Sequence, residues 1–374
     1  MSFSTDKNEQ DQLNKIIISY NTKSLKEALL EANYNRSKAP NLSNFPQFHN
    51  IIGLINFRLN DLKQAIFDFE TAIKINPNFH TAHYNLGLVY FNTKDLKKSY
   101  DCFVKALSIK KDYKLARDKI IELLSFYKPN NNNENQILDL NKKIFNIPCK
   151  IDFTKKISDS HMIDYFKKCK KIVSKNLADL SYNKVQIFRK KSIFLNCERH
   201  KSIFFKYNTI PEYCFGCFKV VVETKNFFDL LKVSLIFDKI EFFNNFNRKN
   251  MIDKRTNEDV FKSIIYCTSL QQVLDVEKKT KKVFETLLDN FTVESKRGCH
   301  EYSIKYPEYK KIYKKESELM SFPKKWSNNE RKFDLENNKK DIKDQIFVHD
   351  TQKGISLHEF LIINNWFKDQ KISI

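Results

Sequence analysis

Apolar residues in the first third of the chain recur every three or four positions, in segments separated by short polar turns. This spacing places them on one face of an α-helix, so residues 9–128 are predicted to form a row of amphipathic helices. The pattern stops at Lys128-Pro129, where the run NNNNEN follows. Proline disfavours a helix at the residue before it and an asparagine run cannot pack, so residues 129–136 are predicted to be a linker.

The pattern changes after this linker, where strand-like and helix-like segments alternate. Strands or extended segments are predicted at Lys184–Phe188, Phe218–Glu223, Phe261–Cys267 and Phe291–Ile304, and helices at Ser158–Leu180, Asn226–Ile240 and Leu270–Leu288. If residues 248–253 add a strand that turns at 256–259, the order is βαββαβ, the ferredoxin-like arrangement. We therefore expect an α+β domain at 137–320, followed by a basic extension at 321–374 that contains an amphipathic helix.

Composition supports the helical part of this prediction. The chain has only 5 Gly and 8 Pro in 374 residues, too few for the many tight turns of an all-β sandwich. Its 66 basic and 45 acidic residues give a net charge of +21, which by itself suggests a polyanionic partner. However, only 9 of the basic residues are Arg, the better residue for bidentate phosphate contacts. Base-biased codons would give the same lysine-rich composition, so the charge is a weak guide to partners.

The compartment is inferred from the start of the chain and from the cysteines. The start, MSFSTDKNEQDQ, has neither the basic nor the apolar region of a signal peptide. The apolar stretch Phe227–Phe243 is interrupted by charged residues such as Asp229 and Lys232, and is too polar to span a bilayer. Without export, the eight Cys are expected to be thiols or metal ligands rather than disulfides. We expect a cytoplasmic protein.

Two segments of the first third match each other at an offset of 34 residues, one starting at Pro46 and the other at His80. They share a glycine, a small residue, a phenylalanine and an alanine at equal positions. These residues are Gly53 and Gly87, Ala65 and Ser99, Phe69 and Phe103, and Ala72 and Ala106, with Pro77 near the end of the first segment. The pattern resembles the tetratricopeptide repeat (TPR), a helix-turn-helix unit.

The resemblance implies an α-helical solenoid of about 2.5 to 3 repeats. A more degenerate first copy is expected over residues 13–40, with Ala28 and Ala32 at matching positions. A helix at Lys114–Tyr127 is expected to cap the exposed end of the array. In each repeat, the small residues let the two helices approach closely, and the phenylalanine is expected to fill the gap to the next repeat.

The resemblance also implies a function, because TPR arrays hold a partner peptide in a concave groove lined by the first helix of each repeat. By family position, the groove residues are Asn50, Leu54, Phe57 and Arg58 in one repeat, and Thr81, Tyr84, Asn85, Leu88 and Phe91 in the next. Asn85 matches an asparagine that hydrogen-bonds a ligand backbone, and with Arg58 as the one basic residue a carboxylate clamp is not expected. Alternatively, these side chains face solvent and the array packs against the rest of the chain.

The sharpest motif in the second half contains Cys197 and His200, then Cys214 and Cys217. Each pair is separated by two residues, and two such pairs on separate turns can supply the four ligands of a tetrahedral zinc ion. Gly216 would permit a tight turn between the last two cysteines. The spacing therefore predicts a structural zinc site on a finger-like hairpin.

Three alternatives to zinc stay open for these cysteines. They can be ordinary core residues, because free cysteine is among the most buried residue types. Cys214 and Cys217 can form a redox dithiol, although a strand rather than a helix is predicted to follow them. An iron–sulfur cluster would use Cys267 or Cys299 as an additional ligand.

Motifs for catalysis are scarce. Cys299 and His300 are neighbours in a predicted strand, where successive side chains point to opposite faces. His358-Glu359 lacks the second histidine of a zinc protease, because position 362 is Ile. Neither a glycine-rich phosphate loop nor G-x-S-x-G occurs, so no enzymatic activity is predicted.

These observations predict an adaptor whose TPR array binds a protein or peptide and whose C-terminal α+β domain has no assigned activity. The alternative is a nucleic-acid-associated protein whose basic, zinc-stabilised C-terminal domain binds RNA or DNA. Against that alternative, the lysine runs fall mostly on the polar faces of predicted helices, as is usual for solvated surfaces. No membrane partner is expected.

Overall fold

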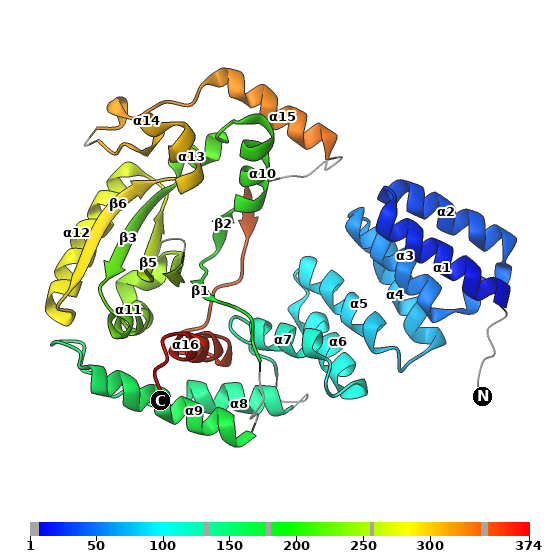
Figure 1. Cartoon of the computed structure of the whole chain (residues 1–374), viewed down its shortest axis with the longest axis horizontal. Coiled ribbons are helices and arrows are strands. Elements are labelled where there is room, and N and C mark those ends of the chain that lie inside the picture. Colours follow the sequence, from blue (N-terminus) through cyan, green and yellow to red (C-terminus); the bar gives the residue numbers. More distant parts are fainter. Residues whose placement is uncertain (1–6, 131–134, 177–180, 255–257, 314, 338–342) are drawn as a thin grey trace. The chain divides into compact units, whose positions relative to one another are not determined.

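The computed structural model describes residues 7–130, 135–176, 181–254, 258–313, 315–337 and 343–374. These residues form two compact units, residues 1–139 and residues 140–374, and each unit is described by itself. Figure 1 shows that the first unit is entirely helical and that the second combines helices with a sheet. Among the described helices, none is both long and apolar enough to cross a membrane.

The first unit is a series of helices connected by short turns, and successive helices pack in pairs (Figure 1). The helices are α1 (Lys7–Thr22), α2 (Leu25–Lys38), α3 (Pro46–Arg58), α4 (Leu62–Ile75), α5 (His80–Asn92), α6 (Leu96–Ile109) and α7 (Lys114–Leu123). The pairs α3 with α4 and α5 with α6 are the two matching segments of the sequence, and α1 with α2 is the expected degenerate copy. We call the first helix of each pair helix A and the second helix B.

Both sequence repeats use the same turn between helix A and helix B. Asp61 and Asp95 begin α4 and α6 as N-caps, and each carboxylate accepts a hydrogen bond of 3.1 Å from the third backbone N–H that follows. The residue before each aspartate has a left-handed backbone, with φ of 66° at Asn60 and 69° at Lys94. The repeated chemistry explains why the two helix pairs adopt the same geometry.

A glycine on helix A lies directly against a phenylalanine ring on helix B. A Cβ atom added to Gly53 would lie 2.7 Å from the Phe69 ring, and one added to Gly87 would lie 2.6 Å from the Phe103 ring. Phe69 and Phe103 are fully buried. Each ring therefore packs within its own repeat. Phe69 also clusters with Leu86 and Val89 of α5, as expected for a side chain that fills the gap to the next repeat.

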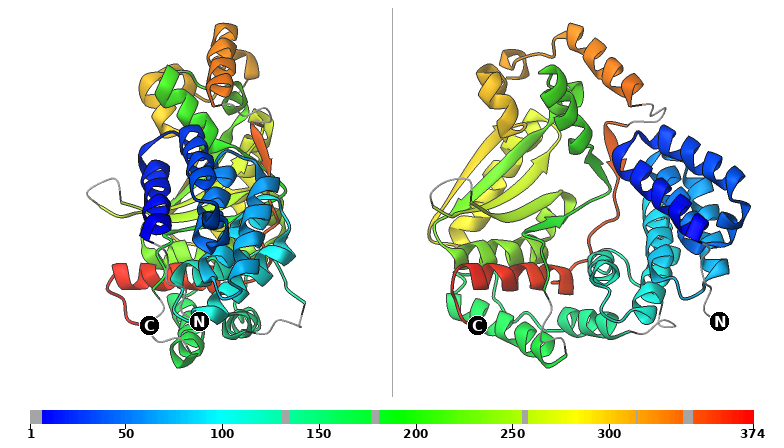
Figure 2. Two further views of the ribbon diagram at one scale, coloured as in Figure 1. Left: turned by 90° about the vertical axis from the view of Figure 1, so that its right-hand side faces the viewer. Right: turned by 45° about the vertical axis from the view of Figure 1, so that its right-hand side comes forward.

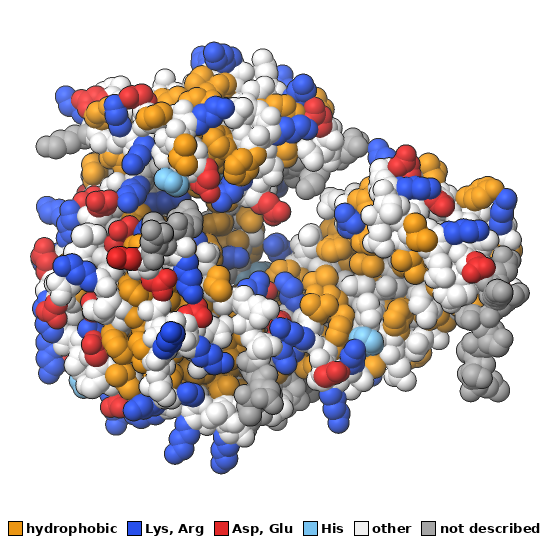
Figure 3. Space-filling view, viewed as in Figure 1, with side chains coloured by type: hydrophobic (Ala, Val, Ile, Leu, Met, Phe, Trp, Pro, Cys, Tyr) orange, Lys and Arg blue, Asp and Glu red, His pale blue; other side chains and the backbone are white. Residues whose placement is uncertain are grey.

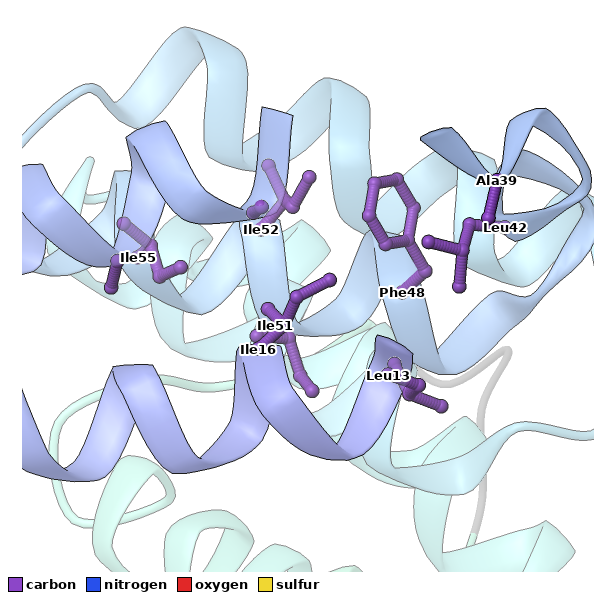
Figure 4. Close-up of a cluster of buried hydrophobic side chains, with 10 residues drawn as sticks. Leu13, Ile16, Ala39, Leu42, Phe48, Ile51, Ile52 and Ile55 are labelled. Carbon is purple, nitrogen blue, oxygen red and sulfur yellow. The ribbon is translucent and has the colours of Figure 1, made fainter. Parts of the chain in front are cut away.

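The degenerate first pair has a core of its own, which α3 completes (Figure 4). Leu13 and Ile16 of α1 meet Ile51, Ile52 and Ile55 of α3 in one buried cluster. The cluster also contains Ala28 and Ala32, the two alanines of α2 predicted at close-packed positions, and both are fully buried. The first pair is thus packed as a repeat despite its weak sequence match.

The second unit contains helices, five strands in one sheet and a separate two-stranded ribbon (Figure 1). Its helices are α9 (Asp159–Asn176), α10 (Cys197–Tyr207), α11 (Phe227–Lys239), α12 (Leu270–Leu287), α13 (His300–Lys305), α14 (Pro307–Lys310), α15 (Ser327–Glu336) and α16 (Leu357–Asp369). Its strands are β1 (Gln186–Arg189), β2 (Ile193–Leu195), β3 (Phe218–Thr224), β4 (Arg248–Asp253), β5 (Val260–Cys267), β6 (Phe291–Arg297) and β7 (Gln345–Phe347). Helix α8 (Gln136–Phe145) spans the division between the units.

The main sheet is antiparallel, with strand order β1-β4-β5-β3-β6, and β2 pairs with β7. Along the chain, the order β3-α11-β4-β5-α12-β6 is the predicted βαββαβ series. The predicted turn at 256–259 lies partly outside the described residues. Both helices cover one face, because Phe227 of α11 contacts Phe261 of β5 and Phe284 of α12 contacts Phe291 of β6, in ring pairs 6.3 and 5.7 Å apart.

Two predictions about local structure in this unit are wrong. The extended segment predicted at Phe291–Ile304 ends at Arg297, because Gly298 adopts a left-handed φ of 60° and α13 follows. The segment predicted as a finger-like hairpin instead forms α10 and a short 3-10 helix at Glu212–Gly216. Asn196 is the N-cap of α10, and its side chain accepts a hydrogen bond from the Arg199 backbone N–H. This cap stabilises a helix that begins at Cys197.

The C-terminal helix α16 is part of the core of the second unit. Its Phe367 contacts Phe166 of α9 and Phe227 of α11, with ring centroids 5.9 and 4.9 Å away, and Figure 2 shows α16 beside these helices. Arg189 of β1 joins α16 to α11 through ion pairs with Glu359 at 2.9 Å and Asp238 at 2.7 Å. All three side chains of this ion cluster are at most 3% exposed. If one of them were removed, water could not compensate the charges of the other two.

The packing of the repeats gives a test of stability. Phe103→Ala removes the ring that rests on Gly87, and we expect it to lower the free energy of unfolding of the first unit by about 3–5 kcal/mol. Hydrogen exchange of the α5 and α6 amides in the full chain measures this loss locally. Phe67→Ala is the matched control, because Phe67 lies on helix B of the preceding repeat and is 60% exposed. Equal effects of the two variants would contradict the packing described.

Candidate functional site

The nine residues predicted to line the groove lie on the A helices of two successive repeats. Asn50, Leu54, Phe57 and Arg58 are on α3, and Thr81, Tyr84, Asn85, Leu88 and Phe91 are on α5. The two asparagines are buried, Arg58 is exposed, and the other six are half-buried. We call these nine residues the helix A surface.

The two buried asparagines join the repeats through their side chains. The Asn85 amide nitrogen donates a hydrogen bond of 2.9 Å to the Asn50 side-chain oxygen. Asn85 is 6% exposed and Asn50 is 7% exposed, so this bond is shielded from water. Asn85 was expected to bond a ligand backbone, and the structure adds a role in holding α5 against α3.

Half-buried apolar residues occupy equal positions in the two repeats. Leu54 and Leu88 correspond, as do Phe57 and Phe91, at an offset of 34 residues in the sequence. Leu54 and Phe57 pack at the edge of a buried cluster that includes Phe69. A side chain that is partly packed and partly exposed is held in place and still offers apolar surface to a ligand.

One residue of α7, Lys119, and one residue after its end, Phe126, extend this surface, and the sequence did not identify them. The Phe126 ring lies 6.1 Å from that of Phe91, and the Lys119 ammonium lies 5.2 Å from the Phe91 ring. Lys119 also pairs with Glu122 at 3.1 Å. The sequence treated this segment as a cap, and the 34-residue repeat offset from Phe91 leads to Ser125 rather than to Phe126, so the repeat pattern gave no signal for this contact.

Tyrosines lie at the α5 end of the helix A surface. The Tyr84 ring contacts Tyr113 and Phe103, with centroids 5.5 and 5.6 Å apart. Burial raises the pKa of Tyr84 to about 12, and neighbouring groups, including Tyr113, add to the rise. Burial also raises the pKa of Tyr113, although a side-chain hydrogen bond with Thr81 opposes it. Both hydroxyls therefore stay protonated at neutral pH and can donate hydrogen bonds.

Arg58 is the one basic residue among the predicted groove residues. Its guanidinium lies 5.3 Å from the ring centroid of Tyr20 on α1. This cation–π contact orients Arg58 toward the first pair of helices.

The four predicted zinc ligands are divided among a helix, a 3-10 helix and the start of a strand. Cys197 and His200 are on the first turn of α10, Cys214 is in the short 3-10 helix, and Cys217 directly precedes β3. His200 is 1% exposed and its Nε2 lies 2.8 Å from the Asp344 carboxylate. Its Nδ1 is buried and has no hydrogen-bond partner among the residues that the structure describes.

Of the three thiols of this motif, those of Cys214 and Cys217 are buried and that of Cys197 is half-buried. Cys214 Sγ donates a hydrogen bond to the Tyr302 hydroxyl at 3.7 Å. Burial raises the pKa of Cys214 well above its usual value, that of Cys217 to about 11, and that of Cys197. Within the described ranges, no three His, Cys, Asp or Glu side chains are placed to hold a metal ion. The C-x-x-H spacing of the motif could not predict that His200 bonds Asp344, which lies far away in the sequence.

Asp344 also binds Arg199, the residue beside His200. Arg199 forms further ion pairs with Asp334 at 2.7 Å and Glu330 at 3.5 Å, and it is 8% exposed. This cluster joins α10 to α15 and to the segment before β7. Arg199 and His200 therefore bind the same carboxylate, that of Asp344.

Lysines and glutamates share one face of the main sheet. Lys262 pairs with Asp253 and Glu223 at 3.1 and 3.4 Å, and Lys296 pairs with Glu294 at 3.1 Å. On the face shown in Figure 3, Lys and Arg side chains are dispersed among acidic ones. Such pairs offset the positive charge that would attract a polyanion.

Comparison with known proteins concerns the first unit. Residues 53–94 match a family model described as TPR repeat, and residues 80–113 match one described as Tetratricopeptide repeat. No curated protein matches the chain.

Several solved structures are similar to part of the chain. The first TPR of Spaghetti (RPAP3), bound to the HSP90 peptide SRMEEVD, is 15% identical, with 33% of this chain and 95% of that chain covered and a TM-score of 0.29. The first TPR domain of human RPAP3 is 16% identical, with 31% and 88% covered and a TM-score of 0.29. MamA is 20% identical, with 45% and 80% covered and a TM-score of 0.29.

The family matches and the helix pairs agree on the same residues. Both matched segments coincide with α3 to α6, and they contain the repeated glycine and phenylalanine positions. The N-terminal part of this chain belongs to the tetratricopeptide repeat family.

Proposed function

We propose that the first unit is the peptide-binding module of an adaptor protein, and that its ligand lies on the helix A surface. The observation that carries the proposal is the pair of matching apolar residues left half-buried in each repeat, Leu54 with Phe57 and Leu88 with Phe91. Other repeated apolar positions, such as Phe69, are fully buried and serve the fold. Residues kept apolar where water reaches them are typical of an interaction surface.

The chemistry of the helix A surface favours an extended peptide with apolar side chains. Leu88 and Phe91 offer apolar contact area, and the protonated hydroxyl of Tyr84 can donate a hydrogen bond to a peptide carbonyl. Arg58, held over the Tyr20 ring, is too isolated to bind an acidic C-terminus by itself. We therefore expect the ligand to be recognised through its internal apolar residues.

The second unit would be the part that the adaptor connects to a partner. Its strand order and its two helices on one face support a ferredoxin-like class for β3 to β6. The ion pairs of Lys262 and Lys296 give no support to a nucleic-acid-binding face on this sheet. We assign the second unit no activity.

Peptide binding is tested by selection from a random peptide library against the full chain. We expect selected peptides to bind about tenfold or more weakly to the double variant Leu88→Ala, Phe91→Ala, because truncation of anchoring side chains costs about 1–2 kcal/mol or more. Fluorescence anisotropy with labelled peptides measures the affinity.

Phe67→Ala is the control for this experiment, since Phe67 is an exposed aromatic residue on helix B. Its affinity for the selected peptides should equal that of the unaltered chain. If the peptides bind the double variant as tightly, while circular dichroism shows unchanged helix content, the ligand does not lie on the helix A surface.

Zinc at Cys197, His200, Cys214 and Cys217 stays a prediction that the side-chain arrangement does not favour. His200 would bind through its Nδ1, because its Nε2 already bonds Asp344, but Cys214 and Cys217 would have to bind as thiolates, which their burial disfavours. Elemental analysis of the purified full chain tests it, and about one zinc per chain would support the site. A much lower content, with Cys214→Ser and Cys217→Ser leaving stability unchanged, would remove it.

A further inference from the structure

The ribbon of β2 and β7 is a sheet of its own in the second unit, and its two antiparallel strands pair with each other (Figure 1). The Val348 N–H donates a hydrogen bond of 2.6 Å to the Ser192 carbonyl, and the Asn196 N–H donates one of 2.7 Å to the Asp344 carbonyl. In an antiparallel pair, such bonds recur at every second residue. The residues of β7 therefore face β2 and face away from it in alternation.

Gln345 and Phe347 point their backbone N–H and C=O groups away from β2. Within the described chain, none of these backbone groups has a hydrogen-bond partner. The outer side of β2 is partly occupied, because the Asn247 side chain donates a hydrogen bond of 3.1 Å to the Ile193 carbonyl. We call the outward side of β7 the β7 edge.

The side chains of β7 do not protect this edge. All three residues are exposed, including Ile346 at 42% and Phe347 at 57%, and none of them is charged or a proline. Folded proteins usually protect an edge strand with such residues. Strand β6, at the edge of the main sheet, has Glu294 and Lys296. The β7 edge instead offers an uncharged template for pairing with another strand.

Contacts on both sides of β7 hold it in an extended form. The Phe194 ring, on the partner strand β2, lies 6.2 Å from the Phe188 ring and 5.6 Å from the Tyr266 ring of the main sheet. Beyond β7, the Thr351 N–H donates a hydrogen bond of 3.0 Å to the Lys190 carbonyl. These contacts limit the freedom of β7 before it pairs, and less freedom lowers the entropic cost of binding.

The β7 edge is complementary to a second copy of itself. If two β7 strands run antiparallel about a twofold axis at Ile346, Gln345 of each chain lies opposite Phe347 of the other. Each such pair exchanges both of its backbone hydrogen bonds, so every outward N–H and C=O of the two edges gains a partner. The two Ile346 side chains then meet at the axis, in the position where opposite side chains lie closest. A twofold dimer needs one surface that fits itself, and this edge has that property.

From this geometry we propose that two copies of the chain associate through their β7 edges and form one antiparallel sheet with the strand order β2-β7-β7-β2. The interface is small, because β7 has 3 residues, so the dimer forms and dissociates reversibly. Each chain carries a net charge of +21, and β7 itself has no charged residue. Salt therefore strengthens the association, because it screens the repulsion between the two chains.

A dimer of this kind would have two helix A surfaces and would bind two peptide segments at once. This consequence rests on the proposed function of the first unit. The dimer itself does not, because the β7 edge belongs to the second unit. Loss of peptide binding and loss of dimerisation can therefore be measured separately.

Sedimentation equilibrium of the reduced full chain tests the association without any substitution. We expect the average mass to rise with protein concentration from that of one chain toward that of two, and to rise more steeply at higher salt. The mass of one chain at every concentration would overturn the proposal and would leave the β7 edge to a strand of another protein.

Disulfide crosslinking locates the interface. Under a mild oxidant, Ile346→Cys should join two chains through position 346, because the two side chains meet at the twofold axis. Phe205→Cys is the matched control, since Phe205 is a 68% exposed residue of α10, and it should crosslink roughly tenfold more slowly or less. Equal rates for the two variants would overturn the proposal.

Phe347→Pro removes the outward N–H of β7 and spares its hydrogen bonds to β2. It should weaken the dimer roughly tenfold or more, because the twofold axis doubles the loss of each backbone hydrogen bond. Phe347→Leu is the control, because it keeps the N–H and an apolar side chain, and it should dimerise normally. Hydrogen exchange of the Asn196 amide, which bonds Asp344, shows whether the ribbon is intact. If that amide stays protected and both variants dimerise equally, the β7 edge is not the interface.

Discussion

The contact between a glycine on helix A and a phenylalanine on helix B determines the architecture of the first unit. At Gly53 and Gly87 there is no room for even one additional carbon, because the rings of Phe69 and Phe103 occupy that space. The close approach fixes how far the two helices of each repeat stand apart. Since the turn chemistry at Asp61 and Asp95 is also repeated, the A helices of the two repeats present equal positions on one surface.

The helix A surface follows from this constraint. Once the phenylalanines and alanines of helix B are buried between the helices, Leu54, Phe57, Leu88 and Phe91 are left at the outer edge of the packing. The bond between Asn50 and Asn85 then holds neighbouring A helices together. This bond limits how far the two A helices can move apart, and less freedom before binding lowers the entropic cost of binding a ligand.

The sequence predicted most where a structural feature depends on local spacing. The repeats of α3 to α6 follow from periodicity and turn residues. The βαββαβ order was expected on the condition that residues 248–253 form a strand, and β4 is that strand. It failed where a contact between distant residues decides the outcome. His200 bonds Asp344, 144 positions away, and Cys299 meets Lys219 across the sheet, so a motif read from C-x-x-H spacing could not identify either partner. The ion pairs of Arg189 with Asp238 and Glu359, which join α16 to the core, could not be predicted for the same reason.

The central claim is that a peptide binds to the helix A surface of the first unit. The most direct measurement places a photocrosslinking amino acid at Leu88 in the full chain and, separately, at Phe67, and irradiates each protein with a labelled peptide selected for binding. The account predicts a covalent adduct from position 88 and none from position 67, although Phe67 is the more exposed side chain. Adducts from position 67 and none from position 88 would contradict it.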